Sequence, residues 1–157
     1  MNWRSSFAVL AAAVLLCSCS GEADQPQEGL PRTQITIDGA RGPLTFDVEL
    51  ATTDASRTKG LMFRRHLSKH EGMLFEFDRE DFRAFWMKNT MIPLDIIFVR
   101  ADGTISNIAE ETIPYSETPV PSSEPAKAVL EIAGGEARAQ GVAPGQKIHA
   151  KFFKNER

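Results

Sequence analysis

Cysteine is scarce in this chain. Its 157 residues include two cysteines, Cys17 and Cys19, and both lie close to the first residue. No cysteine follows Cys19, which excludes a disulfide framework, a thiolate metal site and a cysteine nucleophile from the rest of the chain.

Basic stretches and the common catalytic motifs are also missing. The net charge is −3 and no basic run is present that would follow a phosphate backbone, so we expect no nucleic-acid partner. The G-x-S-x-G elbow, the phosphate-binding P-loop and the dinucleotide-binding glycine pattern do not occur. The apolar run 7–16 is too short to cross a bilayer, which takes about 20 apolar residues.

The first residues instead have the pattern of an export signal. Arg4 supplies a positive charge ahead of the apolar run 7–16, and the string Leu16-Cys17-Ser18-Cys19 follows. A large apolar residue, a small residue and then a cysteine resemble the bacterial lipobox. We therefore predict that residues 1–18 are a signal peptide and that Cys19 becomes the lipidated first residue, carrying acyl chains such as palmitate.

This reading predicts a lipoprotein of the cell envelope, anchored to a membrane by its lipid. Ser20 follows the cysteine, which is compatible with the periplasm-facing side of the outer membrane if the host is Gram-negative. The alternative is a plain secretory signal that is cut nearby, for instance after Ser20 or Ala23.

The remainder is predicted to be a tether and one domain. Residues 19–32 are polar with Pro26, Gly29 and Pro31, a composition typical of a flexible linker. Residues 33–155 form the expected single globular domain, since the whole chain is 42% hydrophobic and 25% charged.

Short alternating segments dominate this domain. Residues 33–38 and 44–50 alternate polar and apolar side chains around a turn, which predicts a hairpin. The remaining expectations are helices at 52–63 and 136–140 and strands at 72–77, 94–99, 104–110, 128–132 and 147–153. We predict an α+β fold, mainly β: a compact barrel-like or sandwiched antiparallel sheet with one or two short helices.

Four strings within this domain are distinctive. They are RTKGLMFR (57–64), GMLFEF (72–77), FWMKNTMIPLD (85–95) and VLEIAGG (129–135). Together the chain resembles the family called domain of unknown function 192 over about residues 33–153. The resemblance implies a compact β-rich α+β domain, often exported or membrane-tethered in bacteria, and it implies no activity.

A candidate polar site comes from the residues themselves. Asp95 interrupts an apolar strand, and a buried carboxylate needs a partner. Arg57 and Arg64 share one face of the expected helix, while Lys88 and Asn89 lie in the loop before Asp95. We predict that Arg57, Lys88 and Asp95 converge and that Asp95 pairs with at least one cation.

Such a cluster has two interpretations. As a ligand site, its cations would hold a carboxylate, a phosphate or sugar hydroxyls, with Trp86 as a stacking surface. As a structural feature, it would be a salt-bridge network that locks the helix to the sheet. Glu131, alone in an apolar strand, is expected either to pair with a cation or to act in catalysis. The candidate ligand-binding residues are Arg57, Arg64, Trp86, Lys88, Asn89, Asp95 and Glu131.

Metal and cofactor chemistry receives little support. His66 and His70 are four residues apart, as a metal pair on a helix would be, but Gly72 favours a loop there. We expect no metal and no cofactor.

Three functions stay open: an envelope accessory domain that binds a small anionic or carbohydrate-like ligand, an envelope hydrolase that uses Asp95 and Glu131, and a structural domain that binds another envelope protein. We favour the first over an enzyme.

Overall fold

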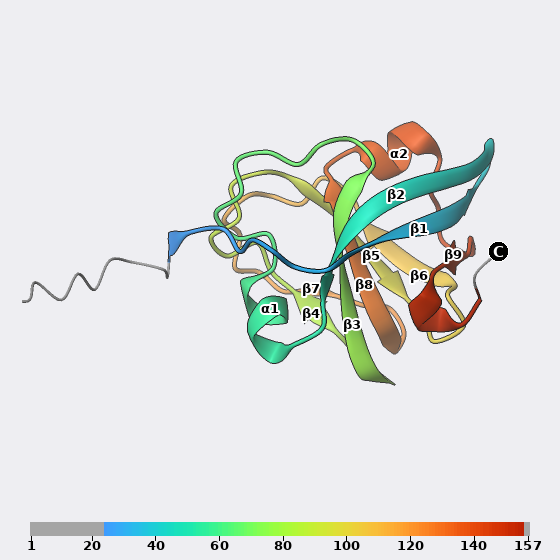
Figure 1. Cartoon of the computed structure of the whole chain (residues 1–157). Coiled ribbons are helices and arrows are strands. Elements are labelled where there is room, and N and C mark those ends of the chain that lie inside the picture. Colours follow the sequence, from blue (N-terminus) through green and yellow to red (C-terminus); the bar gives the residue numbers. More distant parts are fainter. Residues whose placement is uncertain (1–23, 156–157) are drawn as a thin grey trace, which may run out of the picture.

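The computed structural model describes residues 24–155 (Figure 1). One seven-stranded sheet has the order β6-β5-β8-β3-β2-β1-β9, and β4 pairs with β7 in a separate two-stranded sheet. The elements in chain order are β1 (Arg32–Gly39), β2 (Gly42–Ala51), α1 (Asp54–Lys59), β3 (Glu71–Asp81), β4 (Ala84–Phe85), β5 (Leu94–Val99), β6 (Ile105–Ala109), β7 (Val120–Pro121), β8 (Ala126–Ala133), α2 (Glu136–Gln140), β9 (Ile148–His149) and the 3₁₀ helix η2 (Lys151–Phe153). The predicted fold class is confirmed.

The expected hairpin is formed by β1 and β2. Their register pairs Ile35 with Phe46 and Ile37 with Leu44, so one apolar face turns inward. The two strands meet at Gly39 and Gly42, where Gly42 adopts a φ of 121° that a side chain would resist.

One strand pair departs from the antiparallel expectation, because β2 and β3 run parallel. Parallel neighbours need a long crossover to return the chain to the same end of the sheet, and residues 52–70 provide it. This crossover contains α1, which is shorter than predicted. Thr53 caps it in a capping box with Ser56, and Gly60 ends it at a φ of 48°.

The centre of the sheet is β5, β8 and β3. All six residues of β5 are buried, as expected for a strand that is covered on both faces. In the register of these strands, Glu131 of β8 lies between Met73 of β3 and Ile96 of β5. This register places Glu131 in the middle of the sheet.

The sheet curls and buries an apolar cluster on each face. The first cluster lies inside the curl and includes Ile37, Phe46, Leu130 and Ile132. A bridge between Thr104 and Lys147 joins the two edges of the sheet around it. The second cluster lies on the other face, under α1 and the β4–β7 pair, and consists of Ala51, Leu61, Met73, Phe75, Met87, Leu94, Ile96, Phe98, Ala126 and Val129. Within the described residues 24–155, every strand and both clusters of buried residues fall between residues 32 and 153.

Two local predictions had wrong bounds. The expected last strand, 147–153, is a two-residue β9 followed by η2, and the expected strand 72–77 continues to Asp81 in β3. No helix among residues 24–155 is long and apolar enough to span a membrane. Cys17, Cys19 and the predicted signal peptide lie outside the described residues.

Candidate functional site

A pocket of about 520 Å³ opens between α1 and the strands β3 and β4, on the face of the second apolar cluster. We call it the α1 pocket. Its lining combines aromatic and aliphatic side chains with a few charged ones. They are Asp54, Arg57, Thr58, Lys59, Gly60, Leu61, Met62, Phe75, Phe77, Phe82, Arg83, Ala84, Phe85, Trp86, Thr90 and Glu131.

The most unusual group in this pocket is the carboxyl of Glu131. The residue is only 4% exposed, and that exposure is to the pocket that it lines. Its carboxyl takes part in none of the side-chain hydrogen bonds or ion pairs between residues of the described range 24–155, so the expected cation partner of Glu131 is not there. Burial raises the pKa of this carboxyl to about 8, because a charge without a partner is costly in an apolar setting.

Aromatic rings line the same pocket as this carboxyl. Phe75 and Phe85 meet edge to face with ring centroids 4.9 Å apart. Phe85 in turn packs against Phe98 of the core. Trp86 is 45% exposed, and the ammonium group of Lys88 lies over its ring at 5.1 Å. The pocket therefore offers flat apolar surfaces beside one buried acid.

Two arginines stack on Phe77 at the rim. The Arg57 guanidinium lies 5.2 Å and the Arg83 guanidinium 4.0 Å from the ring centroid. The Arg57 side chain is held by the segment before α1 and by β3, since its Nη1 donates to the carbonyls of Thr52 and Glu76, each at 2.7 Å. Burial is the main cause that lowers the pKa of Arg83.

The charges around Arg83 also affect its pKa. The positive charges of Arg57 and Arg79 lower it further, against the opposing effect of Asp81. Arg57 and Arg83 therefore repel one another at the rim, and an anion placed between them would be favoured. Sequence reasoning missed Arg83. Its position inside the aromatic segment 82–86 was the available signal.

Asp95 does not belong to this pocket, and the prediction that it pairs with Arg57 or Lys88 was wrong. It is fully buried and accepts three backbone N–H groups, from Glu111 at 2.7 Å, Gly135 at 2.9 Å and Ala137 at 2.8 Å. Two of these donors begin α2, where Gly135 has a φ of 82° and no side-chain cap of its own. Asp95 thus caps α2 from a neighbouring strand.

Asp95 and Glu131 also cannot act as a catalytic pair. Asp95 lies on the same face of β5 as Ile97 and Val99, which belong to the cluster inside the curl. Glu131 alternates with Leu130 and Ile132 of that same cluster, and so points to the opposite face of the sheet. A two-carboxylate hydrolase needs both groups on one side of its substrate, and this geometry excludes it for these two residues.

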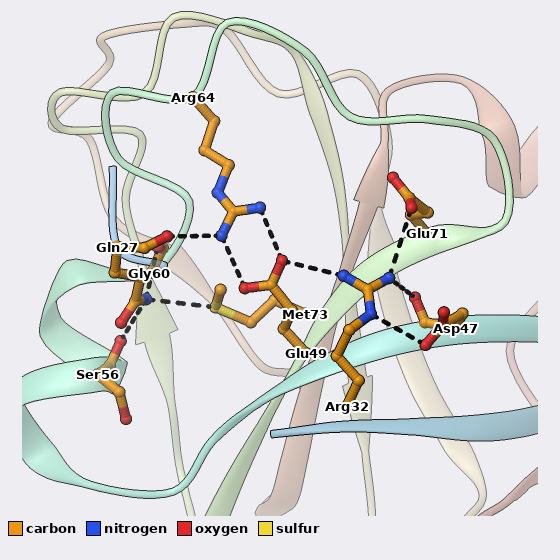
Figure 2. Close-up of polar contacts among 9 residues, drawn as sticks. All are labelled: Gln27, Arg32, Asp47, Glu49, Ser56, Gly60, Arg64, Glu71 and Met73. Atoms are coloured by element: carbon orange, nitrogen blue, oxygen red, sulfur yellow. Dashed lines mark hydrogen bonds and ion pairs between the residues drawn. The ribbon is translucent and has the colours of Figure 1, made fainter. Parts of the chain in front are cut away.

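Arg64 lies in a separate network, which Figure 2 shows. Its guanidinium makes two 2.7 Å contacts to the carboxylate of Glu49. Arg32 approaches the same carboxylate from the other side at 3.3 Å and also contacts Asp47 and Glu71. This is the salt-bridge interpretation of the predicted cluster, realised for Arg64 alone.

The same network holds the segment before β1. Arg64 donates to the backbone carbonyl of Gln27 at 2.9 Å. The Gln27 side-chain amide donates to the carbonyl of Ser56 within α1 at 3.1 Å and to that of Gly60, just after α1, at 2.7 Å. Part of the predicted tether is therefore attached to the wall of the α1 pocket.

The structure thus divides the seven predicted site residues. Arg57, Trp86 and Glu131 meet in the α1 pocket. Lys88 is not among the residues that line the pocket, but its ammonium group contacts the Trp86 ring. The backbone carbonyl of Asn89 accepts a hydrogen bond from the Phe63 N–H at 2.8 Å.

The strands of the fold lie almost entirely within the part of the chain that matches a known family. The profile of the family DUF192, described as an uncharacterised ACR, matches residues 33–150. The chain belongs to this family. The match runs from the second residue of β1 to just past β9, so it includes the α1 pocket and the Asp95 cap, while Arg32 and Gln27 of the Glu49 network lie before it.

Two solved structures resemble this DUF192 domain. A protein of unknown function from Novosphingobium aromaticivorans is 46% identical, covers 84% of this chain and 94% of its own, and superposes with a TM-score of 0.77. A protein from Sinorhizobium meliloti, provisionally named a transcription regulator, is 36% identical, covers 80% of this chain and 98% of its own, and has a TM-score of 0.77. The search of curated proteins found no match.

The histidines of the DUF192 domain do not gather. Among the described residues, no three His, Cys, Asp or Glu side chains are placed to hold one metal ion. His66 contacts Ser68 at 3.3 Å, whereas His70 packs against the ring of Phe46 with centroids 5.3 Å apart.

Proposed function

We propose that this domain binds a small ligand in the α1 pocket, and that the ligand carries both hydroxyl groups and an anionic group, as a sugar acid or sugar phosphate does. The observation that carries the proposal is the buried carboxyl of Glu131, which lines the pocket without a partner in the described part of the chain. A buried polar group of this kind costs stability unless something binds it. Its presence is explained if a ligand supplies the missing hydrogen bonds.

The chemistry of the pocket floor favours an uncharged polar group. With a pKa of about 8, the Glu131 carboxyl is protonated in about ten molecules for each ionised one at pH 7. A protonated carboxyl both donates and accepts a hydrogen bond. A hydroxyl group also donates and accepts, so a ligand hydroxyl can form hydrogen bonds with the protonated Glu131 carboxyl while both groups stay uncharged.

The walls and the rim favour the other parts of the ligand. The exposed ring of Trp86 provides a flat apolar surface on which the C–H face of a sugar can rest. Arg57 and Arg83 flank Phe77 at the rim, where a carboxylate or phosphate would relieve their mutual repulsion.

We also propose that the domain works in the cell envelope, exported by residues 1–18 and tethered through a lipid on Cys19. The string Leu16-Cys17-Ser18-Cys19 supports this proposal. A DNA-binding role of the kind named for the Sinorhizobium relative has less support, because the net charge of this chain is −3 and it lacks a basic stretch.

The binding test uses the fluorescence of Trp86 in residues 24–157, where it is the sole tryptophan because the second one is Trp3. Glucose 6-phosphate and glucuronate should change the emission in a saturable way, with glucose and inorganic phosphate binding at least tenfold more weakly. Glu131→Leu should abolish the response.

The control is Glu76→Gln, which changes a partly buried carboxyl whose pKa is also raised by burial but which is not among the residues that line the pocket. Its binding curve should match the wild type. Equal binding by wild type and Glu131→Leu, or no response to either anionic sugar, would contradict the proposed ligand class.

A further inference from the structure

Four large apolar side chains are exposed near the mouth of the α1 pocket. Phe82 is 67%, Trp86 45%, Ile113 74% and Tyr115 61% exposed. Two of them, Phe82 and Trp86, also line the pocket. Large apolar residues gathered on a surface mark a contact with a partner or a membrane.

Backbone hydrogen bonds place the turn that carries Ile113 and Tyr115 next to the segment that follows Trp86. The N–H of Met87 donates to the carbonyl of Ser116 at 2.8 Å, and the N–H of Tyr115 donates to the carbonyl of Thr90 at 3.0 Å. The turn 113–116 is therefore fastened to the segment 87–90 that follows Trp86. We call Phe82, Trp86, Ile113 and Tyr115 the aromatic rim.

The backbone of this turn is held in an unfavourable conformation. Tyr115 in the turn has a φ of 61°, and Glu111, which precedes the turn, has a φ of 48°. Residues other than glycine adopt positive φ values at an energetic cost. The hydrogen bond to Thr90 maintains this geometry while the Tyr115 ring stays in solvent.

Positive charge accompanies the rim. Lys88 lies over Trp86, and Arg57, Lys59 and Arg83 line the adjoining pocket. Asp54 is the one acidic side chain on the outer part of that pocket, and it is paired with Arg57. Aromatic residues mixed with cations are typical of surfaces that rest on anionic lipid headgroups.

The start of the described chain lies on the same side. Gln27 is bonded to Gly60, a residue of the pocket wall, and Figure 1 shows the segment before β1 leaving past α1 and the neighbouring loops. Cys19 lies eight residues before Gln27, a separation that an extended chain spans in at most about 26–29 Å. A lipid on Cys19 would keep the rim close to the bilayer.

We infer that the aromatic rim docks on a membrane surface that contains anionic lipid, so that the mouth of the α1 pocket faces the headgroups. This inference rests on the proposed envelope location and deepens it. Trp86 and Tyr115 would lie at the headgroup level, where their rings have both apolar and polar contacts. Ile113 and Phe82 would enter the acyl boundary.

The test uses residues 24–157, which carry no lipid, and vesicles of phosphatidylcholine with or without phosphatidylglycerol. Trp86 emission should shift to shorter wavelength with the anionic vesicles at millimolar lipid, and much less with the neutral ones. Ile113→Ser combined with Tyr115→Ser should weaken this partitioning by about tenfold or more, since both large side chains leave the membrane contact.

A charge-matched pair checks the electrostatic contribution. Lys88→Glu should weaken binding to anionic vesicles. Arg41→Glu, in the exposed β1–β2 turn at the far end of the hairpin (Figure 1), should leave it unchanged.

Two outcomes would overturn the inference: no emission shift with anionic vesicles, or equal partitioning of the wild type and the Ile113/Tyr115 double variant. The pocket is tested separately by titrating glucose 6-phosphate without vesicles, where the double variant should bind as the wild type does. Membrane fractionation of Cys19→Ser made together with the Ile113/Tyr115 double change, compared with the double variant that keeps Cys19, tests the lipid anchor by itself, so each failure is assigned to one claim.

Discussion

Replacing Glu131 by glutamine should change how the stability of this domain depends on pH. The carboxyl is 4% exposed, and burial raises its pKa from 4.5 to about 8. Above pH 8 the folded domain must hold an unpaired buried charge, whereas the unfolded chain ionises freely from about pH 4.5. The folded state therefore binds the extra proton between these values, and stability falls as pH rises through this window.

The magnitude follows from the same two pKa values. Each tenfold preference for the protonated form corresponds to about 1.4 kcal/mol, so the shift from 4.5 to about 8 destabilises the folded state by up to about 5 kcal/mol. Below about pH 4.5 both states are protonated and the cost vanishes. Glutamine has nearly the same shape and never ionises. The variant and the wild type should therefore be similar in stability at pH 5 and diverge by about 1.4 kcal/mol per pH unit up to pH 8.

The assay is urea unfolding of residues 24–157, followed by Trp86 fluorescence at several pH values from 5 to 8.5. Glu76 and Glu136 also have pKa values raised by burial, and that of Asp102 is lowered, mainly by its hydrogen bond with the Thr104 backbone. These groups are common to both proteins, so subtracting the two curves removes their contribution. Parallel stability curves for Glu131→Gln and wild type would refute the reasoning.

Three further changes test the Asp95 cap, the contact between Arg64 and Glu49, and the proposed lipid on Cys19. Asp95→Ala should lower the free energy of unfolding by about 3–5 kcal/mol, because three backbone N–H groups lose their acceptor; a loss under about 1 kcal/mol in urea unfolding would contradict the capping role. Arg64→Ala should cost about 2–3 kcal/mol, because Glu49 loses its two closest contacts, and should increase amide exchange around Gln27; unchanged exchange there would argue against the attachment. In the Ile113/Tyr115 double variant, which lacks rim docking, Cys19→Ser should release the exported protein from membranes in fractionation, and a protein that stays membrane-bound there would disprove the lipid anchor.

The strands were predictable where the pattern is local. The alternation in 33–38 and 44–50 and the apolar run 94–99 identify β1, β2 and β5 to within two residues of the observed bounds. The parallel pairing of β2 with β3 was not predictable in this way, because it depends on where the crossover 52–70 returns the chain.

The partner of Asp95 was missed for a related reason. Its three donors are backbone groups at residues 111, 135 and 137, and backbone donors leave little trace in a side-chain pattern. The glycine pair 134–135 was the available hint. Arg57 and Lys88 were reasonable partners for a buried carboxylate by charge, but the structure keeps both on the other face of the sheet.

Glu131 was identified as unusual, yet its surroundings required the tertiary structure. A lone carboxylate in an apolar strand has the same sequence pattern whether it meets a cation or an empty pocket. The register of the sheet decides between these cases, because it places Glu131 between the apolar residues Met73 and Ile96.

A crystal structure of residues 24–157 grown with glucuronate or glucose 6-phosphate tests the central claim most directly. The account predicts a sugar hydroxyl at hydrogen-bond distance from the Glu131 carboxyl, about 2.6–3.2 Å, and the anionic group between Arg57 and Arg83. An empty α1 pocket at saturating ligand, or the ligand bound only outside that pocket, would contradict it.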